Sequence, residues 1–263
     1  MHIVEPEAIV PTAATPGNAA RMRMLSRWGE PLLFADWMRV LMIHFEVDVE
    51  QLRRAVPYQL DLHDGRAFVT LVAFSMENMR PCVGGRFGAW MFKPIATHDF
   101  LNVRTYVKHN GEPGIHFLTE WLSNRLAVAL GPRTFGLPYR HGSIYYAHDW
   151  EAGRVCGRVT DSATRMEFSY RADLEIGAPF TPCERGSLDE WLMERYAAFN
   201  CVRGRRRFFR IWHPVWPQCR ADVSLKDISL IEQDWPWFRD AHLASANFSP
   251  GIRNVWMGRP FNI

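Results

Sequence analysis

Two stretches of the chain carry side chains that bind anions or transfer protons. The first is a strand pattern over residues 101–109, in which Asn102, Arg104, Tyr106 and Lys108 alternate with apolar residues and share one face. An arginine on such a face can pair bidentately with a carboxylate, and an asparagine amide can hydrogen-bond a carbonyl or hydroxyl group. Solvent exposure explains the same pattern. The face is therefore either ordinary polar surface or the wall of a site for an organic acid.

The second stretch is the turn at residues 135–142, where glycine and proline precede Tyr139, Arg140 and His141. Such a turn either aims polar groups into a pocket or forms a structural corner. His141, and His116 in a neighbouring strand pattern, can exchange protons near neutral pH if they border a pocket, although a packed or exposed histidine is the simpler interpretation. The candidate catalytic residues are Tyr139, Arg140 and His141, and the candidate substrate-binding residues are Asn102, Arg104, Tyr106 and His116.

No sequence motif indicates a metal site or a nucleotide site. The ten histidines show no His-x-His, His-x-x-x-His or Cys-His cluster, and neither a Gly-x-Gly-x-x-Gly nor a Walker-type loop occurs. The Gly-x-Ser-x-Gly pattern of serine hydrolases is also absent. We expect no metal and no cofactor.

Charge and cysteine usage restrict partners and location. The formal net charge is +3, and the one basic run, residues 203–207, reads as a solvated loop, so we expect no nucleic acid partner. The five cysteines fall singly, without a Cys-x-x-Cys pair, which fits a reducing cytoplasm. No apolar stretch approaches the roughly 20 residues of a membrane span, and no signal segment is visible. The sequence predicts a cytoplasmic protein without a membrane partner.

The elements that must position these side chains are mostly strands. Residues 1–26 are rich in Pro, Ala and Thr and predict a flexible arm, and residues 27–263 predict a single domain. Residues 67–76 are apolar on both alternating faces, as in a strand covered on both sides. Many strand patterns with few helices and no βαβ alternation predict an α+β fold that is mostly antiparallel β.

Helices and a long loop are expected at a few places. Asp48 and Ser187 are predicted N-caps, and the helix after Ser187 is expected to run to Phe199. Residues 124–130 predict a short helix that Gly131-Pro132 ends. Residues 80–94 hold three Gly and two Pro and predict a long loop, with a lid over a pocket as one role.

Several separated motifs in register resemble the YqjF-like family, domain of unknown function 2071. They are LNVRTYV at residues 101–107, NRLAV at 124–128, FGLPY at 135–139, ERY at 194–196 and HPVWP at 213–217. The resemblance covers the chain from about residue 28 to its end. It implies the acetoacetate decarboxylase-like superfamily, whose fold is a closed cone-shaped antiparallel barrel with peripheral helices and a central pocket. The superfamily also suggests a homo-oligomer.

The resemblance fails at the residues that define the superfamily's chemistry. Acetoacetate decarboxylase carries Gly-x-Pro-Lys-Lys, whose first lysine forms an imine with the keto acid. The matching positions here, residues 136–140, read Gly-Leu-Pro-Tyr-Arg. A phenol cannot form an imine, and a guanidinium stays protonated. The other candidates, Lys93, Lys108 and Lys226, read as surface lysines, so Schiff-base decarboxylation is not expected.

Three functions stay open on these grounds. The first is a protein that binds or transforms a small carboxylate or carbonyl metabolite through Arg, Tyr and His groups. The second is a binding protein that holds such a metabolite without catalysis. The third is an interaction protein with a filled barrel, which would use its N-terminal arm and arginine run. A central cavity with polar walls would separate the first two from the third.

Overall fold

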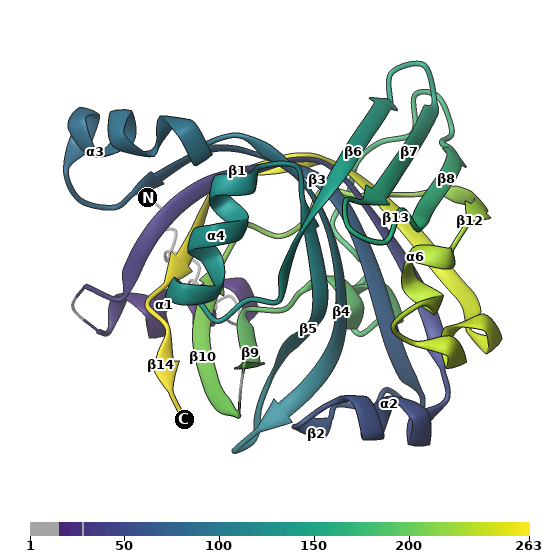
Figure 1. The fold of residues 1–263 in the computed structure, drawn as a ribbon, viewed down its shortest axis with the longest axis horizontal. Coiled ribbons are helices and arrows are strands. Elements are labelled where there is room, and N and C mark those ends of the chain that lie inside the picture. Colours follow the sequence, from purple (N-terminus) through teal and green to yellow (C-terminus); the bar gives the residue numbers. More distant parts are fainter. Residues whose placement is uncertain (1–15, 28, 203) are drawn as a thin grey trace, which may run out of the picture.

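The computed structural model describes residues 16–27, 29–202 and 204–263, which form an α+β fold dominated by antiparallel strands (Figure 1). The strands are β1 (Pro31–Val47), β2 (Gln59–Leu60), β3 (Ala67–Pro81), β4 (His98–His109), β5 (Glu112–Leu122), β6 (Tyr139–Asp149), β7 (Arg154–Asp161), β8 (Glu167–Asp173), β9 (Ala197–Val202), β10 (Arg205–Trp212), β11 (Cys219–Arg220), β12 (Asp222–Asp227), β13 (His242–Gly258) and β14 (Phe261–Asn262). The helices are α1 (Pro16–Leu25), α2 (Val49–Ala55), α3 (Gly85–Phe92), α4 (Arg125–Thr134), α5 (Leu188–Met193) and α6 (Ser229–Glu232), with 3-10 helices η1 (Lys93–Ile95) and η2 (Pro236–Asp240).

Seven strands close into a ring in the order β5, β9, β10, β13, β1, β3, β4 and back to β5. All these pairings are antiparallel except β5 with β9, which are parallel and meet at Ile115 and Ala198. The side chains that point into the ring form one hydrophobic cluster, which includes Val72, Phe117 and Ile211. The ring confirms the expected fold class and encloses the interior in which a site can lie.

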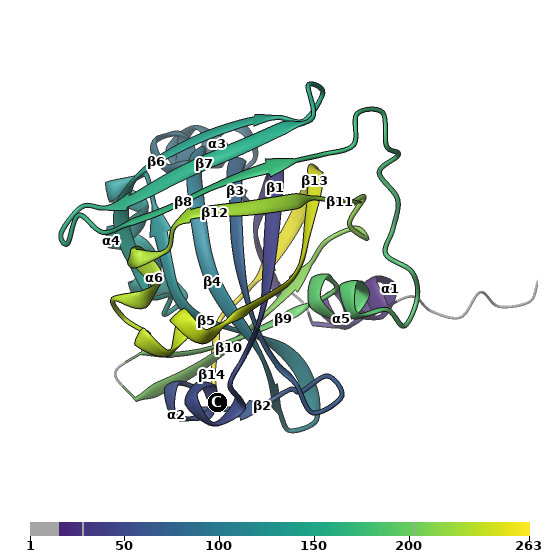
Figure 2. The same ribbon diagram turned by 90° about the vertical axis from the view of Figure 1, so that its right-hand side faces the viewer.

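A second layer of strands covers the outer face of the ring. The strands β6, β7, β8 and β12 pair antiparallel in that order, and β6 joins the ring through a short parallel pairing with β5. Figure 2 shows this layer crossing β4, β3 and β1. A second hydrophobic cluster fills the space between the layers, with Leu71 and Val103 from the ring and Val159 and Phe168 from the cover. Where the second layer covers it, the ring wall is therefore packed against apolar side chains on both faces.

The double apolar pattern of residues 67–76 is explained by these two clusters. All ten of these residues in β3 are buried. Alternate side chains point into the ring, such as Phe74, and toward the covering layer, such as Leu71. The prediction of a strand covered on both sides is confirmed.

The predicted N-caps are confirmed. The Asp48 carboxylate accepts a hydrogen bond from the backbone N–H of Gln51 at 2.8 Å, and the Ser187 hydroxyl accepts one from Glu190 at 3.2 Å. Asn124 caps α4 in the same way. Gly131-Pro132, however, does not end α4, which continues to Thr134. The prediction of a stop there was wrong. The last turn keeps its helical form, and its Arg133 and Thr134 side chains bond the carbonyls of Ala129 and Leu130 at the helix end.

The helix predicted to run to Phe199 ends at Met193 instead. Residues 197–202 form β9, which pairs with β10 over six residues, from Ala197 with Arg210 to Val202 with Arg205. As a strand, β9 gains ladder hydrogen bonds and closes the ring. Tertiary pairing therefore overrides the helical spacing of the apolar residues in this segment. Residues 205–207 of the basic run form the start of β10 rather than a free loop, with the Arg207 guanidinium bonded to the Thr134 carbonyl at 2.9 Å.

The segment predicted as a long loop, residues 80–94, is largely helical. It holds the end of β3, α3 and the start of η1, and Gly84 enters α3 with a left-handed φ of 88°. Gly88 packs against Pro81, which leaves no room for a side chain there. In Figure 1, α3 projects beyond the ring beside β3.

Part of the predicted N-terminal arm is ordered as a helix. The first fifteen residues of the arm lie outside the described residues, whereas α1 packs on β10. Ala20 and Met24 are buried, and the Trp212 indole donates to the Gly17 carbonyl at 3.0 Å. In the described part of the chain, no helix is long and apolar enough to cross a membrane.

Candidate functional site

A cavity of about 60 Å³ lies inside the strand ring and is lined by polar as well as apolar side chains. Its polar and ionisable walls come from the ring strands β4 and β5, from the start of β6, and from the segments that follow α5 and β10. They are Asn102, Arg104, Glu120, Tyr139, Arg195 and His213. We call this space the inner cavity.

The strand β4 supplies the first two polar walls. Asn102 and Arg104 are two residues apart, so both point to the same face, and that face is the ring interior rather than solvent. Both side chains are buried. Tyr106 continues the row but lies beyond the inner cavity, where its hydroxyl donates to the Leu192 carbonyl at 3.0 Å. Lys108, at the end of the row, is exposed and contacts the Asp61 carboxylate at 2.7 Å.

A bulge in β5 brings a carboxyl group that the strand pattern does not reveal into the inner cavity. The register moves from Val103 opposite Thr119 to Arg104 opposite Phe117, which leaves Leu118 without a partner. The extra residue lets Phe117 and Glu120 point inward together, although three positions apart on a regular strand face opposite ways. Alternation alone would place Glu120 outside.

Tyr139 completes a row of polar residues across three neighbouring strands. Asn102 of β4 pairs with Glu120 of β5, and Glu120 pairs in parallel with Tyr139 at the start of β6. The turn before Tyr139 depends on Gly136, which has a φ of 68° and lies against the Arg207 side chain. The row places an amide, a carboxyl and a phenol side by side on the cavity wall.

Five lining residues each keep one buried polar atom without a hydrogen-bond partner among the described residues. These atoms are Trp37 Nε1, Asn102 Oδ1, Arg104 Nε, Glu120 Oε2 and Arg195 Nη2. Buried polar atoms are nearly always satisfied in native proteins, so a group of unsatisfied ones around a cavity indicates a polar occupant. A cavity of this size can also hold about two water molecules.

Arg104 is the least compensated charge in this group. Its Nη2 atom reaches the Met42 sulfur at 3.6 Å and the Leu192 carbonyl at 3.5 Å, and no carboxylate of the described residues lies within 4.0 Å. Burial lowers the pKa of Arg104, yet a guanidinium stays protonated at neutral pH. Arg195, by contrast, is paired with Asp61 at 2.7 Å. A buried cation without a counter-charge is a ready site for an anion.

Burial favours the neutral forms of both Glu120 and Tyr139. Burial raises the pKa of the Glu120 carboxyl well above its usual value, which favours the protonated acid. Burial likewise raises the pKa of the Tyr139 phenol, and the neighbouring Glu120 raises it further. Both shifts favour the form that carries a proton, from which the inner cavity can offer hydrogen bonds to a carbonyl oxygen.

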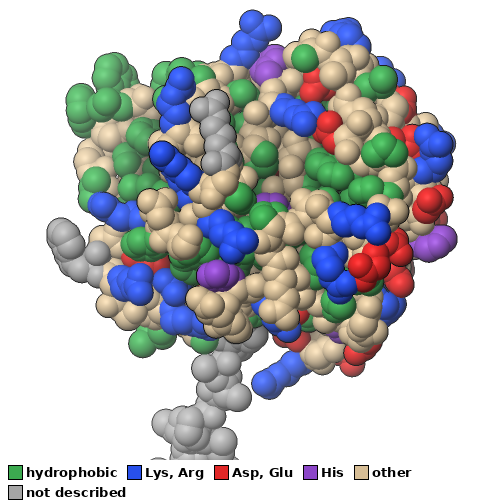
Figure 3. Space-filling view, turned by 60° about the horizontal axis from the view of Figure 1, so that its bottom comes forward, with side chains coloured by type: hydrophobic (Ala, Val, Ile, Leu, Met, Phe, Trp, Pro, Cys, Tyr) green, Lys and Arg blue, Asp and Glu red, His purple; other side chains and the backbone are tan. Residues whose placement is uncertain are grey.

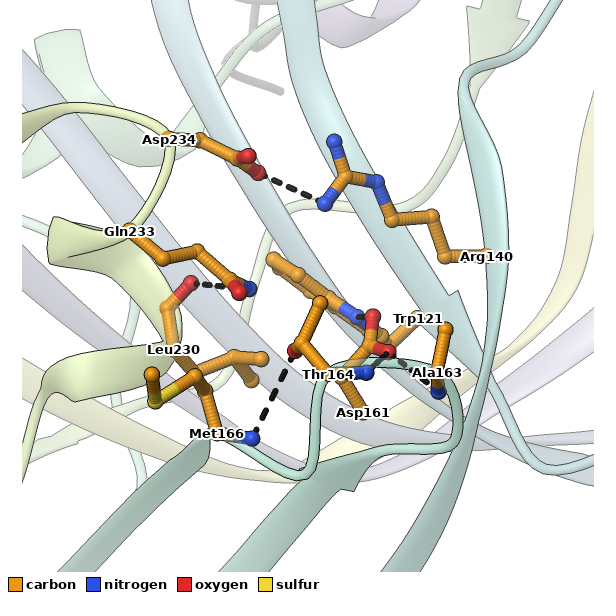
Figure 4. Close-up of polar contacts among 9 residues, drawn as sticks. All are labelled: Trp121, Arg140, Asp161, Ala163, Thr164, Met166, Leu230, Gln233 and Asp234. Atoms are coloured by element: carbon orange, nitrogen blue, oxygen red, sulfur yellow. Dashed lines mark hydrogen bonds and ion pairs between the residues drawn. The ribbon is translucent and has the colours of Figure 1, made fainter.

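The other predicted site residues lie elsewhere. Arg140 points away from the inner cavity and pairs with Asp234 at 2.7 Å, above the ring of Trp121, as Figure 4 shows. The His141 ring lies 2.6 Å from the Ser162 hydroxyl and does not line the inner cavity. His116 is buried against the ring of Tyr58, where its Nδ1 donates to the Phe199 carbonyl at 2.7 Å.

The chain's three lysines, Lys93, Lys108 and Lys226, are all exposed, and none lines the inner cavity. No described residues form a group of three His, Cys, Asp or Glu side chains that could hold a metal ion. The chemistry available to the inner cavity is that of two guanidinium groups, an amide, a carboxyl, a phenol and an imidazole.

The Tyr139 ring depends on a glycine for its position. A Cβ atom on Gly131 of α4 would lie 2.0 Å from Tyr139 Cε2. Gly131→Ala should therefore destabilise the protein by about 1–3 kcal/mol through overpacking, although the same change in an open helix stabilises by up to about 1 kcal/mol. Urea unfolding measures this difference. Adding Gly131→Ala to a Tyr139→Ala variant should remove the penalty; a penalty that persists would contradict the contact.

Comparison with solved structures defines the class to which this fold belongs. An acetoacetate decarboxylase-like enzyme from Sphingomonas wittichii RW1 superposes with a TM-score of 0.58 at 15% identity, over 89% of this chain and 93% of that one. The enduracididine biosynthesis enzyme MppR, complexed with pyruvate, gives 0.55 at 13% identity over 88% and 90% of the two chains. The fold is that of the acetoacetate decarboxylase-like proteins.

Sequence comparison gives the family. The model for domain of unknown function 2071, an uncharacterized conserved protein, matches residues 35–252. The uncharacterized protein YqjF of Bacillus subtilis is 35% identical over 203 residues, which cover 73% of this chain and 78% of that protein. The chain belongs to the family of domain of unknown function 2071, as the motifs suggested.

Proposed function

We propose that the inner cavity binds a small organic acid or carbonyl metabolite through its carboxylate, without a Schiff-base lysine. The observation that carries this proposal is the buried Arg104 guanidinium, which faces the cavity with no carboxylate beside it. A ligand carboxylate would supply the missing counter-charge through charge-assisted hydrogen bonds. The pyruvate bound by MppR, a protein of the same fold, is an acid of this kind.

The polar row beside Arg104 defines what the rest of the ligand meets. Asn102 and the neutral Glu120 can hydrogen-bond a carbonyl or hydroxyl group, and the Tyr139 phenol borders the same space. A neutral carboxyl that donates to a carbonyl oxygen polarises it and can also pass on its proton. These groups equip the cavity for acid-base chemistry on a carbonyl compound. The inner cavity also counts against an interaction protein with a filled barrel.

The first experiment is a thermal-shift screen of small keto, hydroxy and unsaturated acids. A ligand at a hundred times its Kd should stabilise the folded protein by about 2.7 kcal/mol, which corresponds to a rise in Tm of roughly 5–10 °C at this chain length. Arg104→Met should abolish that rise. The unliganded variant should be as stable as the wild type or more stable, because the substitution removes a buried, uncompensated charge.

The matched control is Arg140→Met, which removes an arginine outside the inner cavity and should keep the full shift. Absence of any shift in the wild type, or an equal loss in both variants, would overturn the proposal. If an acid binds, Glu120→Gln separates binding from chemistry, because it keeps a hydrogen-bond donor but cannot transfer a proton. Turnover lost with binding retained would show that Glu120 is a catalytic residue.

A further inference from the structure

A second cavity, of about 350 Å³, lies against the inner cavity and is almost entirely apolar. It is bordered by β3, α3, η1 and α4, and we call it the outer cavity. The two cavities share several side chains, so a single layer of residues separates them. The shared residues are Met76, Phe100, Leu137, Tyr139, Phe209 and Met257.

The outer cavity carries no formal charge at neutral pH. Among its described lining residues, only His98 and Tyr139 can titrate. Burial lowers the pKa of His98 to about 4, and burial raises the pKa of Tyr139. The remaining walls are aliphatic or aromatic apart from Thr134. The space therefore favours a hydrocarbon over a polar or charged group.

The volumes of the two cavities suit two different parts of one ligand. At about 60 Å³ the inner cavity is well below the roughly 300–1,000 Å³ of ligand pockets, whereas the outer cavity lies within that range. Polar and unsatisfied groups gather in the small space, and apolar walls line the large one. This division matches a molecule with a small polar head and a larger apolar body.

The outer cavity also opens to the surface. Leu130 and Thr134 of α4 line it and are exposed. Hydrophobic side chains gather outside it on α3, where Phe87, Trp90 and Met91 are each more than half exposed. This apolar group forms the green prominence at the upper left of Figure 3. Phe92, at the end of the same helix, lines the outer cavity, so this apolar surface adjoins it.

We infer that the acid proposed above is amphipathic: a carboxylic acid with an apolar tail of several carbons, its carboxylate at Arg104 and its tail in the outer cavity. The inference rests on the proposed function for the carboxylate end and adds the chemical class of the rest of the ligand. The flexible side chains of Met76 and Met257, which line both cavities, can shift to let the head pass.

The test is a series of straight-chain acids from acetate to decanoate, with binding measured by calorimetry and thermal shift. Each methylene buried in the outer cavity should tighten Kd about fourfold, or about 200-fold between butyrate and octanoate. Ala127→Phe, which fills the outer cavity from α4, should weaken octanoate and leave acetate binding unchanged. Leu130→Trp, at the exposed rim, repeats the test if Ala127→Phe does not fold.

Leu126→Trp is the matched control, because Leu126 is exposed on the same helix and does not line the outer cavity. Affinity independent of chain length would overturn the inference and leave the proposed function standing. Octanol binding as tightly as octanoate would overturn the role of the carboxylate while the apolar site remained. Failure of every acid in the series to bind would overturn both.

Discussion

Asp61→Ala should destabilise the protein by about 3–5 kcal/mol, because it leaves the Arg195 guanidinium buried without its counter-charge. Asp61 lies just after β2, and its Oδ2 accepts from Arg195 Nη1 at 2.7 Å. Both side chains are at most 5% exposed. Arg195 would keep its bond to the Trp191 carbonyl and its contacts with the Trp191 and Tyr106 rings, none of which supplies a negative charge. Urea unfolding of the variant measures the loss.

The matched control for Asp61 is the partner on its other side. Lys108 contacts Asp61 Oδ1 at the same 2.7 Å but has a side chain that is 44% exposed. Lys108→Ala should therefore cost no more than about 1 kcal/mol. Equal costs for Asp61→Ala and Lys108→Ala would show that burial does not strengthen the Arg195 pair. Because Arg195 also lines the inner cavity, a destabilised pair should weaken acid binding as well.

The free energy of unfolding should fall as the pH drops below about 6.5, through histidines that are buried in their neutral form. Burial lowers the pKa of His44 to about 3 and the pKa values of His98 and His148 to about 4. In the unfolded chain these rings take up protons near pH 6.5, so the unfolded state gains protons first. The stabilisation that these neutral histidines contribute is fully present above pH 6.5 and is lost as the pH falls from 6.5 to 4.

The size of this loss follows from the number of rings. Each histidine that stays neutral contributes about 1.4 kcal/mol per pH unit across that window. Glu120 acts in the opposite sense. Its raised pKa makes the folded state hold a proton that the unfolded chain lacks in this pH range, so its effect on stability offsets that of one histidine. The net expected loss between pH 7 and pH 5 is at least about 3 kcal/mol, measured by urea unfolding at each pH.

His148 offers the sharpest check of this dependence. Its Nδ1 donates to the Arg39 carbonyl at 2.7 Å, so in the neutral ring its Nε2 accepts from the Tyr170 hydroxyl at 2.7 Å, and burial opposes a second proton. His148→Gln should flatten the pH dependence by about 1.4 kcal/mol per pH unit. The exposed His242 provides the control, His242→Gln, which should leave the slope unchanged. Identical slopes in both variants would contradict the assignment.

The sequence predicts the faces of strands well where alternation is unbroken. The double apolar pattern of residues 67–76 and the polar face of Asn102, Arg104 and Tyr106 both correspond to the observed wall of the ring. Whether that polar face meets solvent or an interior depends on ring closure. Closure pairs β5 with β9 in parallel, and no local sequence pattern predicts that pairing.

The site was harder to predict because its residues lie at irregularities. Tyr139 and Arg140 open β6 as neighbours, so they point to opposite faces, and only Tyr139 reaches the inner cavity. A turn pattern groups them as if they shared a direction. Strand alternation does not predict Glu120, because the bulge at Leu118 reverses which side chains of β5 face inward. The helical spacing of apolar residues up to Phe199 also gave a wrong prediction, because residues 197–202 form β9 and pair with β10.

The bulge in β5 has a consequence for aligning this chain with its relatives. Removing one residue between Phe117 and Glu120 would give a regular strand in which both side chains still face inward. A relative one residue shorter here would therefore keep its acid in the same place. Alignments of this family should allow a one-residue gap at Leu118 or Thr119, because a gap placed elsewhere in the strand would pair the cavity carboxyl with an outward position.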